Sequence, residues 1–95
     1  MPAFVIVIIN KVIDPQELAE YRRIGVPSLK ETNVKFRVRM GAYEVLEGDP
    51  VEGIVMLEFP TMEEAKAWYH SPAYQEALKH RYAGAKCHAF LVEGA

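Results

Sequence analysis

The sequence predicts an α+β domain in which helices cover one face of a four-stranded antiparallel sheet. Three observations predict this class. Three apolar runs and one alternating segment have the patterns of strands, and helix-start signals precede two helical regions. The elements also follow the order strand, helix, strand, strand, helix, strand. We expect residues 1–95 to form a single domain.

The first strand is predicted at Phe4–Ile9, where six apolar residues follow one another. Because successive side chains point to opposite faces of a sheet, this strand is apolar on both faces. A helix follows, since Asp14 and Pro15 supply an N-cap acceptor and a proline at the first helical position. Pro27 interrupts the helical pattern, which continues to about Thr32.

Two further strands are predicted in the middle of the chain. Polar and apolar residues alternate from Lys35 to Glu47, so we expect a strand that bends at Gly41. In this pattern one face carries Phe36, Val38, Met40 and Ala42, and the other carries Lys35, Arg37, Arg39, Gly41 and Tyr43. After a turn at 47–50, the strand Gly53–Phe59 is again apolar on both faces.

The second helical region has two start signals. Thr61 and Glu64 form a capping box, and Ser71 with Pro72 begins a further segment that ends near Gly84. A basic stretch near the end of this segment, namely Lys79, His80, Arg81 and Lys86, is interpreted as a solvated helix end. The last strand is predicted at 87–92.

This order of elements is the split βαβ or ferredoxin-like arrangement, in which the helices cover only one face of the sheet. Two of its strands are nevertheless apolar on both faces, and such strands need two covering layers. A second copy of the chain is the simplest source of the second layer. We therefore expect a homodimer that pairs through its sheets as a closed or nearly closed α/β barrel.

Composition excludes several classes of protein. The chain is 51% hydrophobic and 25% charged, as in ordinary globular proteins. Eleven basic and thirteen acidic residues form no cationic cluster, so nucleic acid is not an expected partner. The single cysteine, Cys87, lies in an apolar strand pattern, which is typical of a structural thiol in a reducing compartment. No membrane span or secretory signal is recognisable, so we expect a soluble cytoplasmic protein.

Several segments resemble a known family over nearly the whole chain. They include Pro2-Ala3-Phe4-Val5-Ile6-Val7, Glu44-Val45-Leu46-Glu47-Gly48 and, as the most specific, Trp68-Tyr69-His70-Ser71-Pro72-Ala73-Tyr74-Gln75. These segments resemble the domain-of-unknown-function family 1330, of the dimeric α/β-barrel superfamily. The resemblance implies ferredoxin-like protomers paired through their sheets. It leaves function open, because the superfamily includes cofactor-independent oxygenases, isomerases, haem enzymes and ligand-sensing domains.

Arg39 is the first candidate for a binding role. A guanidinium fixed on a strand holds a carboxylate or enolate through two parallel hydrogen bonds. The alternative is an ion pair with Glu58 or Glu44, and the two differ in whether a pocket lies in front of Arg39. Met40 also departs from the family, where the first glycine of an Arg-Gly-Gly is common.

Aromatic residues with polar tips provide the candidate walls of a pocket, namely Tyr21, Trp68, Tyr69 and Tyr74. They fit equally a core with satisfied hydroxyls. His88 is the candidate general base, with a structural histidine as its alternative. The three histidines lack metal-ligand spacing, and no nucleotide or phosphate motif is present, so we expect neither metal nor cofactor.

The sequence thus predicts a homodimer in which each protomer binds a small apolar or aromatic acid, with Arg39 as anchor. One alternative is a cofactor-independent monooxygenase or isomerase that uses a base such as His88. Another is a non-catalytic ligand-sensing or interaction module. An enzyme should hold a base within hydrogen-bond distance of its substrate, whereas an interaction module should have its pocket filled by its own side chains.

Overall fold

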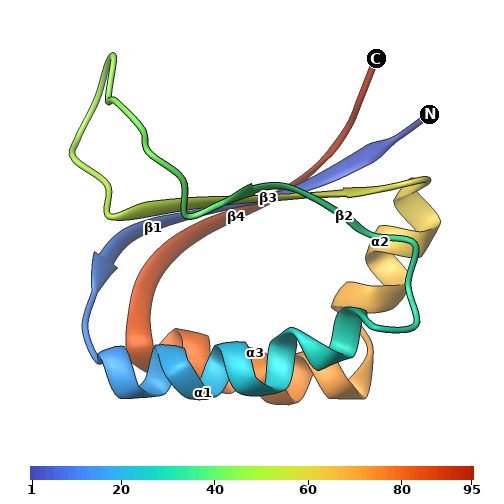
Figure 1. The fold of residues 1–95 in the computed structure, drawn as a ribbon, viewed down its shortest axis with the longest axis horizontal. Coiled ribbons are helices and arrows are strands. Elements are labelled where there is room, and N and C mark those ends of the chain that lie inside the picture. Colours follow the sequence, from blue (N-terminus) through green and yellow to red (C-terminus); the bar gives the residue numbers. More distant parts are fainter.

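A computed structural model describes residues 1–95 as one four-stranded antiparallel sheet with helices on a single face (Figure 1). The sheet has the order β2-β3-β1-β4. This confirms the predicted ferredoxin-like α+β class. The elements are β1 (Ala3–Val12), α1 (Pro15–Gly25), the 3-10 helix η1 (Pro27–Leu29), β2 (Lys35–Arg39), β3 (Gly53–Phe59), α2 (Met62–Tyr69), α3 (Pro72–Gly84) and β4 (Ala85–Glu93).

Each α-helix begins at the cap that the sequence predicts. The side chains of Asp14, Thr61 and Ser71 accept hydrogen bonds from backbone N–H groups in the first turns of α1, α2 and α3. These bonds satisfy donors that have no partner within the helix. The three caps therefore fix the residue at which each helix starts.

The two faces of the sheet differ in burial. On β1, the residues Ala3, Val5, Val7 and Ile9 face the helices and are buried, whereas the residues between them are only partly buried. The open face consists of these alternate residues and the apolar residues that pair with them on the neighbouring strands, namely Phe4, Ile6, Ile8, Val38, Ile54, Met56, Phe90 and Val92. Phe90 is 50% exposed and Val92 is 45% exposed. The open face is therefore the apolar surface that the sequence predicts to lack a covering layer.

The second strand is shorter than predicted. It ends at Arg39 rather than at Glu47, and Met40 adopts a left-handed backbone conformation with φ of 56°. A non-glycine residue rarely takes this conformation, which turns the chain out of the strand. Met40 therefore ends β2 with a bend that glycine forms at lower cost.

The predicted alternation along this strand is wrong beyond Phe36. The register of β2 on β3 shifts between Phe36 and Val38, so that Phe36 pairs with Leu57 and Arg39 pairs with Val55. A β-bulge of this kind inserts one extra residue and changes the face to which the following side chains point. As a result Arg39 lies on the same face as Phe36, toward the helices.

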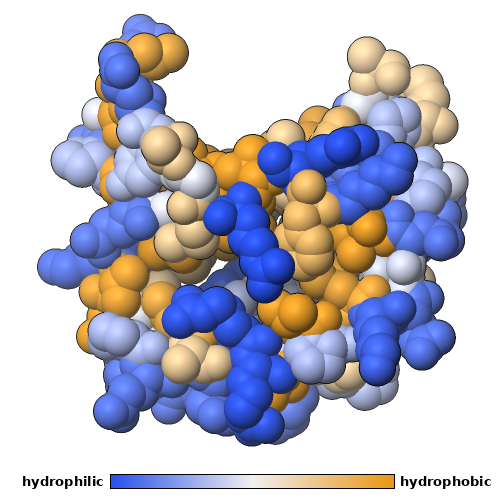
Figure 2. Space-filling view, viewed as in Figure 1, coloured by the Kyte–Doolittle hydropathy of each residue, from blue (hydrophilic) through white to orange (hydrophobic).

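Residues 40–52 form an arm that leaves the sheet on the side opposite the helices (Figure 1). Its apolar residues other than Val51 are exposed, and Leu46 is 86% exposed. Figure 2 shows apolar residues on the floor of the hollow between the arm and the two chain ends. The arm and the open face thus bound one concave apolar surface.

Candidate functional site

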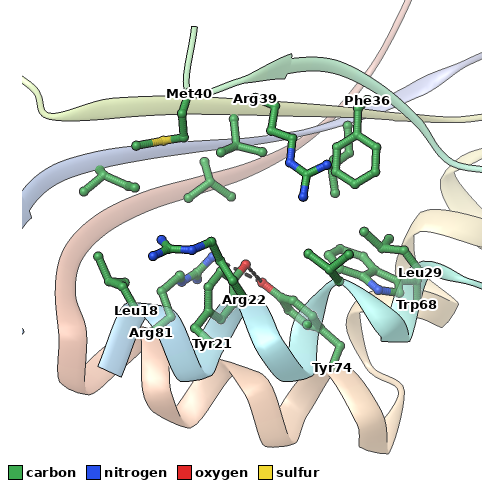
Figure 3. Close-up of a pocket in the computed structure, with 16 residues that line it drawn as sticks. Leu18, Tyr21, Arg22, Leu29, Phe36, Arg39, Met40, Trp68, Tyr74 and Arg81 are labelled. Carbon is green, nitrogen blue, oxygen red and sulfur yellow. Dashed lines mark hydrogen bonds between the residues drawn. The ribbon is translucent and has the colours of Figure 1, made fainter. Parts of the chain in front are cut away.

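A cavity lies between the helical layer and the sheet, with α1 and α3 on one side and β2 and β3 on the other (Figure 3). Its volume is about 120 Å³. An apolar cavity of roughly 150 Å³ is known to hold benzene, so a single ring or a short branched chain fits this space. The lining residues are Val7, Ile9, Leu18, Tyr21, Arg22, Gly25, Val26, Leu29, Phe36, Arg39, Met40, Val55, Leu57, Trp68, Tyr74 and Arg81.

Two arginines lie at the mouth of the cavity. Arg22 on α1 and Arg39 on β2 are exposed, and Figure 3 shows Arg39 descending from the sheet toward the cavity. Arg39 lies over the ring of Phe36, 4.7 Å from its centroid. Glu58, one of its two expected ion-pair partners, instead pairs with Arg37 at 2.8 Å. None of the four ion pairs in the structure involves Arg22 or Arg39.

A third arginine lies at the deep end of the cavity. Arg81 on α3 is only 4% exposed, and its Nη1 donates to the hydroxyl of Tyr74 at 3.3 Å. That hydroxyl is 2.9 Å from the hydroxyl of Tyr21 on α1. The Nε of Arg81 is the one buried side-chain polar atom that has no hydrogen-bond partner. A buried donor is normally paired, so this end of the cavity lacks a hydrogen-bond acceptor.

The aromatic wall is fixed by contacts within the protein. The Nε1 of Trp68 donates to the Oγ of Ser28 at 2.9 Å, which ties α2 to the segment after α1. The Trp68 ring stacks on Phe59 at 5.5 Å and lies 4.1 Å from the ring of Tyr74. Burial, and then the nearby Tyr21 hydroxyl, raise the pKa of Tyr74 above its ordinary value, so its phenol stays neutral. The wall is therefore rigid and uncharged.

The polar groups that line the cavity are of only a few kinds. Its polar side chains belong to three arginines, two tyrosines and one tryptophan, and it contains no carboxylate, imidazole, amine or thiol. Guanidinium and indole groups only donate hydrogen bonds. The cavity is therefore suited to a ligand that presents acceptor oxygens and negative charge on a small apolar body.

The structure brings four of the predicted site residues together and separates two. Tyr21, Arg39, Trp68 and Tyr74 line the cavity. Tyr69 does not line it, although its ring packs 5.4 Å from that of Tyr74. The Tyr74 hydroxyl is satisfied as in the core alternative, so this residue belongs both to the core and to the cavity wall.

His88 lies on the other face of the sheet. It pairs with Ile8 of the open face, its Nδ1 is 2.6 Å from the Oδ1 of Asn10, and its ring stacks on Phe90. It does not line the cavity. Within one protomer the sheet therefore separates His88 from a ligand bound beside Arg39.

Sequence reasoning missed the contribution of Arg81. The prediction that residues 79–86 form a solvated helix end is wrong for this residue, which is buried against the core. The spacing of residues along α3 could have revealed its burial. The buried face of this helix consists of residues at helical spacing, namely Tyr74, Ala77, Leu78 and Arg81. An arginine that continues an apolar stripe indicates a buried guanidinium. Arg22 was missed as well, since nothing in its spacing distinguishes it from a solvated residue.

No three His, Cys, Asp or Glu side chains converge in a way that could hold a metal ion. None of the helices has the length and apolar character needed to cross a membrane.

Comparison with models of protein families identifies the family of the chain. The model of the family described as Domain of unknown function (DUF1330) matches residues 2–95. The chain belongs to the DUF1330 family. This match confirms the resemblance seen in the sequence. Among curated proteins, no match was found for this DUF1330 protein.

Solved structures share the fold of this DUF1330 protein at low sequence identity. A protein of unknown function from Rhodopseudomonas palustris has a TM-score of 0.78 and 20% identity, covering 99% of this chain and 82% of its own. A dimeric ferredoxin-like protein of unknown function from Jannaschia sp. CCS1 has a TM-score of 0.76 and 13% identity, covering 99% and 100%. SnoaB, a cofactor-independent oxygenase from Streptomyces nogalater, has a TM-score of 0.68 and 10% identity, covering 99% and 93%. These similarities show the fold, and some of the similar proteins are described as dimeric.

Proposed function

We propose that this DUF1330 protein binds a small apolar or aromatic acid in the cavity, with Arg39 as the anchor of the carboxylate. The observation that carries the proposal is the lining, which combines apolar walls with three guanidinium groups and no carboxylate. If its role were structural, the buried guanidinium of Arg81 would be expected to pair with an internal acid. The carboxylate of a ligand is the group that this arrangement lacks.

The size of the cavity restricts the ligand. A volume of about 120 Å³ is below the ~300 Å³ at which drug-sized pockets begin. The ligand is therefore a compact acid such as a benzoate or a branched short-chain acid, and the proposal excludes nucleotides and other large ligands. Its apolar body packs between Trp68 and the strands, while its carboxylate stays near the mouth, where Arg22 and Arg39 lie.

We further propose that the protein is a homodimer that pairs through the open face. The exposed apolar residues of the open face and of the arm together form a surface whose contact with water is unfavourable in free energy. The dimeric state of similar folds supports this assembly. In the dimer each sheet would be covered on both sides, by its own helices and by the partner's sheet.

A catalytic role is a second candidate, supported by the shared fold of the Streptomyces nogalater oxygenase. The cavity holds no group that is a base at neutral pH, so it does not abstract a proton by itself. An oxygenase or isomerase at this site would need a substrate that arrives already ionised. The cavity also remains open rather than filled by its own side chains, which favours ligand binding over a pure interaction module.

Binding is tested by calorimetric titration of the protein with benzoate and with benzamide, its neutral analogue. We expect benzoate to bind and benzamide to bind at least tenfold more weakly. Arg39→Ala should weaken benzoate binding by about tenfold to a hundredfold, because hydrogen bonds to charged groups contribute about 1.5–3 kcal/mol. Arg23→Ala is the matched control, since Arg23 lies on the surface of α1 and pairs with Glu20. Failure of benzoate and of a set of short-chain acids to bind would contradict the proposal.

A further inference from the structure

The direction of the hydrogen bonds at the deep end of the cavity is inferred from the donors and acceptors that meet there. Arg81 donates to the oxygen of Tyr74, because a guanidinium has no acceptor. Tyr74 is 1% exposed, so its own proton also needs a partner inside the protein. The oxygen of Tyr21, 2.9 Å away, is the acceptor within reach. The chain of donation therefore runs from Arg81 to Tyr74 and from Tyr74 to Tyr21.

In this arrangement the hydroxyl proton of Tyr21 has no hydrogen-bond acceptor inside the protein. Tyr21 lines the cavity, and its hydroxyl receives a hydrogen bond from a group that is itself hydrogen-bonded to a cation. Hydrogen bonds in such a chain polarise one another, which makes the last donor stronger. The unpaired Nε of the buried Arg81 is a second sign that this end of the cavity lacks an acceptor.

We propose that Tyr21 is a second recognition point for the ligand, and that the ligand is an acid with a second acceptor oxygen, such as an oxo acid. The inference rests on the proposed function, because it assumes that an acid occupies the cavity. Tyr21 and Arg39 project from opposite walls, one from α1 and one from β2 (Figure 3). A ligand with its carboxylate at Arg39 thus presents its second oxygen to Tyr21 when an apolar spacer separates the two groups.

The test uses three five-carbon acids, namely pentanoate, 2-oxopentanoate and 4-oxopentanoate. We expect the protein to bind 4-oxopentanoate about five- to tenfold more tightly than pentanoate, as one hydrogen bond allows. The oxo group of 2-oxopentanoate is adjacent to the carboxylate, so this acid should show a smaller gain in affinity over pentanoate. In Tyr21→Phe the preference for 4-oxopentanoate over pentanoate should disappear, so that the ratio of the two affinities approaches one. Tyr82→Phe is the matched control, because Tyr82 is an exposed tyrosine on α3.

A spectroscopic measurement separates recognition from a general effect on folding. The carbonyl stretch of bound 4-oxopentanoate should shift to lower frequency in the parent protein and in Tyr82→Phe, and it should not shift in Tyr21→Phe. If the acids bind equally well, or if Tyr21→Phe weakens all three by the same factor, the second recognition point is wrong and the proposed function stands. If none of the three acids binds while benzoate does, this inference fails and the proposed function stands. If benzoate does not bind either, both fail.

Discussion

The burial of Arg81 is the most informative property of any single residue in this protein. Its guanidinium is removed from water, contacts a neutral tyrosine hydroxyl, and has no carboxylate partner. Such an arrangement costs free energy in the ligand-free state, because the lost hydration is only partly replaced. A residue that costs stability at the end of a cavity is typical of a binding site.

The substitution Arg81→Met tests this trade between stability and binding. A methionine fills a similar volume without a buried charge, so the free energy of unfolding should rise by about 1 kcal/mol. For a domain of this size the midpoint of thermal unfolding should then rise by about 4–8 °C. Binding of oxo acids should weaken at least tenfold. Thermal denaturation and calorimetric titration check both effects, and a variant that is less stable than the parent would show that Arg81 is structural.

The sequence allowed the prediction of part of this site. Arg39 and the aromatic residues Tyr21, Trp68 and Tyr74 were recognisable by residue type, and they do line one cavity. The role of Arg81 was hidden by its neighbours, because Lys79 and His80 make the stretch look solvated. A helix face is defined by spacing of three and four residues, and local charge density does not reveal it.

At the scale of elements, the pairing of α1 with α3 holds the deep end of the cavity together. The Tyr21–Tyr74 hydrogen bond joins the two helices, and the Nδ1 of His80 lies 2.6 Å from the carboxylate of Glu17. Gly84 allows their ends to approach closely, since a Cβ there would lie 3.0 Å from the backbone N of Leu18. The geometry of the site therefore depends on this helix pair.

The pKa of Tyr74 makes the stability of this pairing depend on pH. Its folded-state pKa is raised by burial, so the folded protein keeps a proton that the unfolded chain loses above about pH 10. The contribution of Tyr74 to the free energy of unfolding should therefore be constant below about pH 10. Above this pH the free energy of unfolding should fall. Denaturant titrations between pH 8 and 11 should show a shallower decline for Tyr74→Phe than for the parent and for Tyr82→Phe. Equal slopes in all three would contradict the assignment.

The strands show where sequence patterns stop being sufficient. The three helix caps and the strands β1, β3 and β4 were predictable, because capping residues and apolar runs are local signals. The bulge between Phe36 and Val38 has no comparable signal, and it decides to which face Arg39 points. Its position depends on how β2 meets β3, which is a tertiary interaction.

At the scale of the whole molecule, the open face and the arm form the surface proposed to bind a second copy. The helices leave this side bare, and exposed apolar residues such as Phe90 and Leu46 lie on it. Two chains that pair here would remove both surfaces from water at once, which drives association.

The substitution Phe90→Asp tests this assembly. A charge within an apolar interface is costly to bury, so the variant should be a monomer of 10.8 kDa while the parent has twice this mass. Ile13→Asp is the matched control, because Ile13 is an exposed apolar residue between β1 and α1, outside the open face. Sedimentation velocity measures the masses. A dimer of unchanged stability in Phe90→Asp would place the interface elsewhere.

A crystal structure of the protein grown with benzoate tests the central claim most directly, because it shows whether an acid occupies the cavity. We expect the ring of benzoate between Trp68 and the strands, with its carboxylate within hydrogen-bond distance of the guanidinium of Arg39. A cavity closed by its own side chains, with Arg39 and Arg81 paired to acids of the protein, would contradict the account.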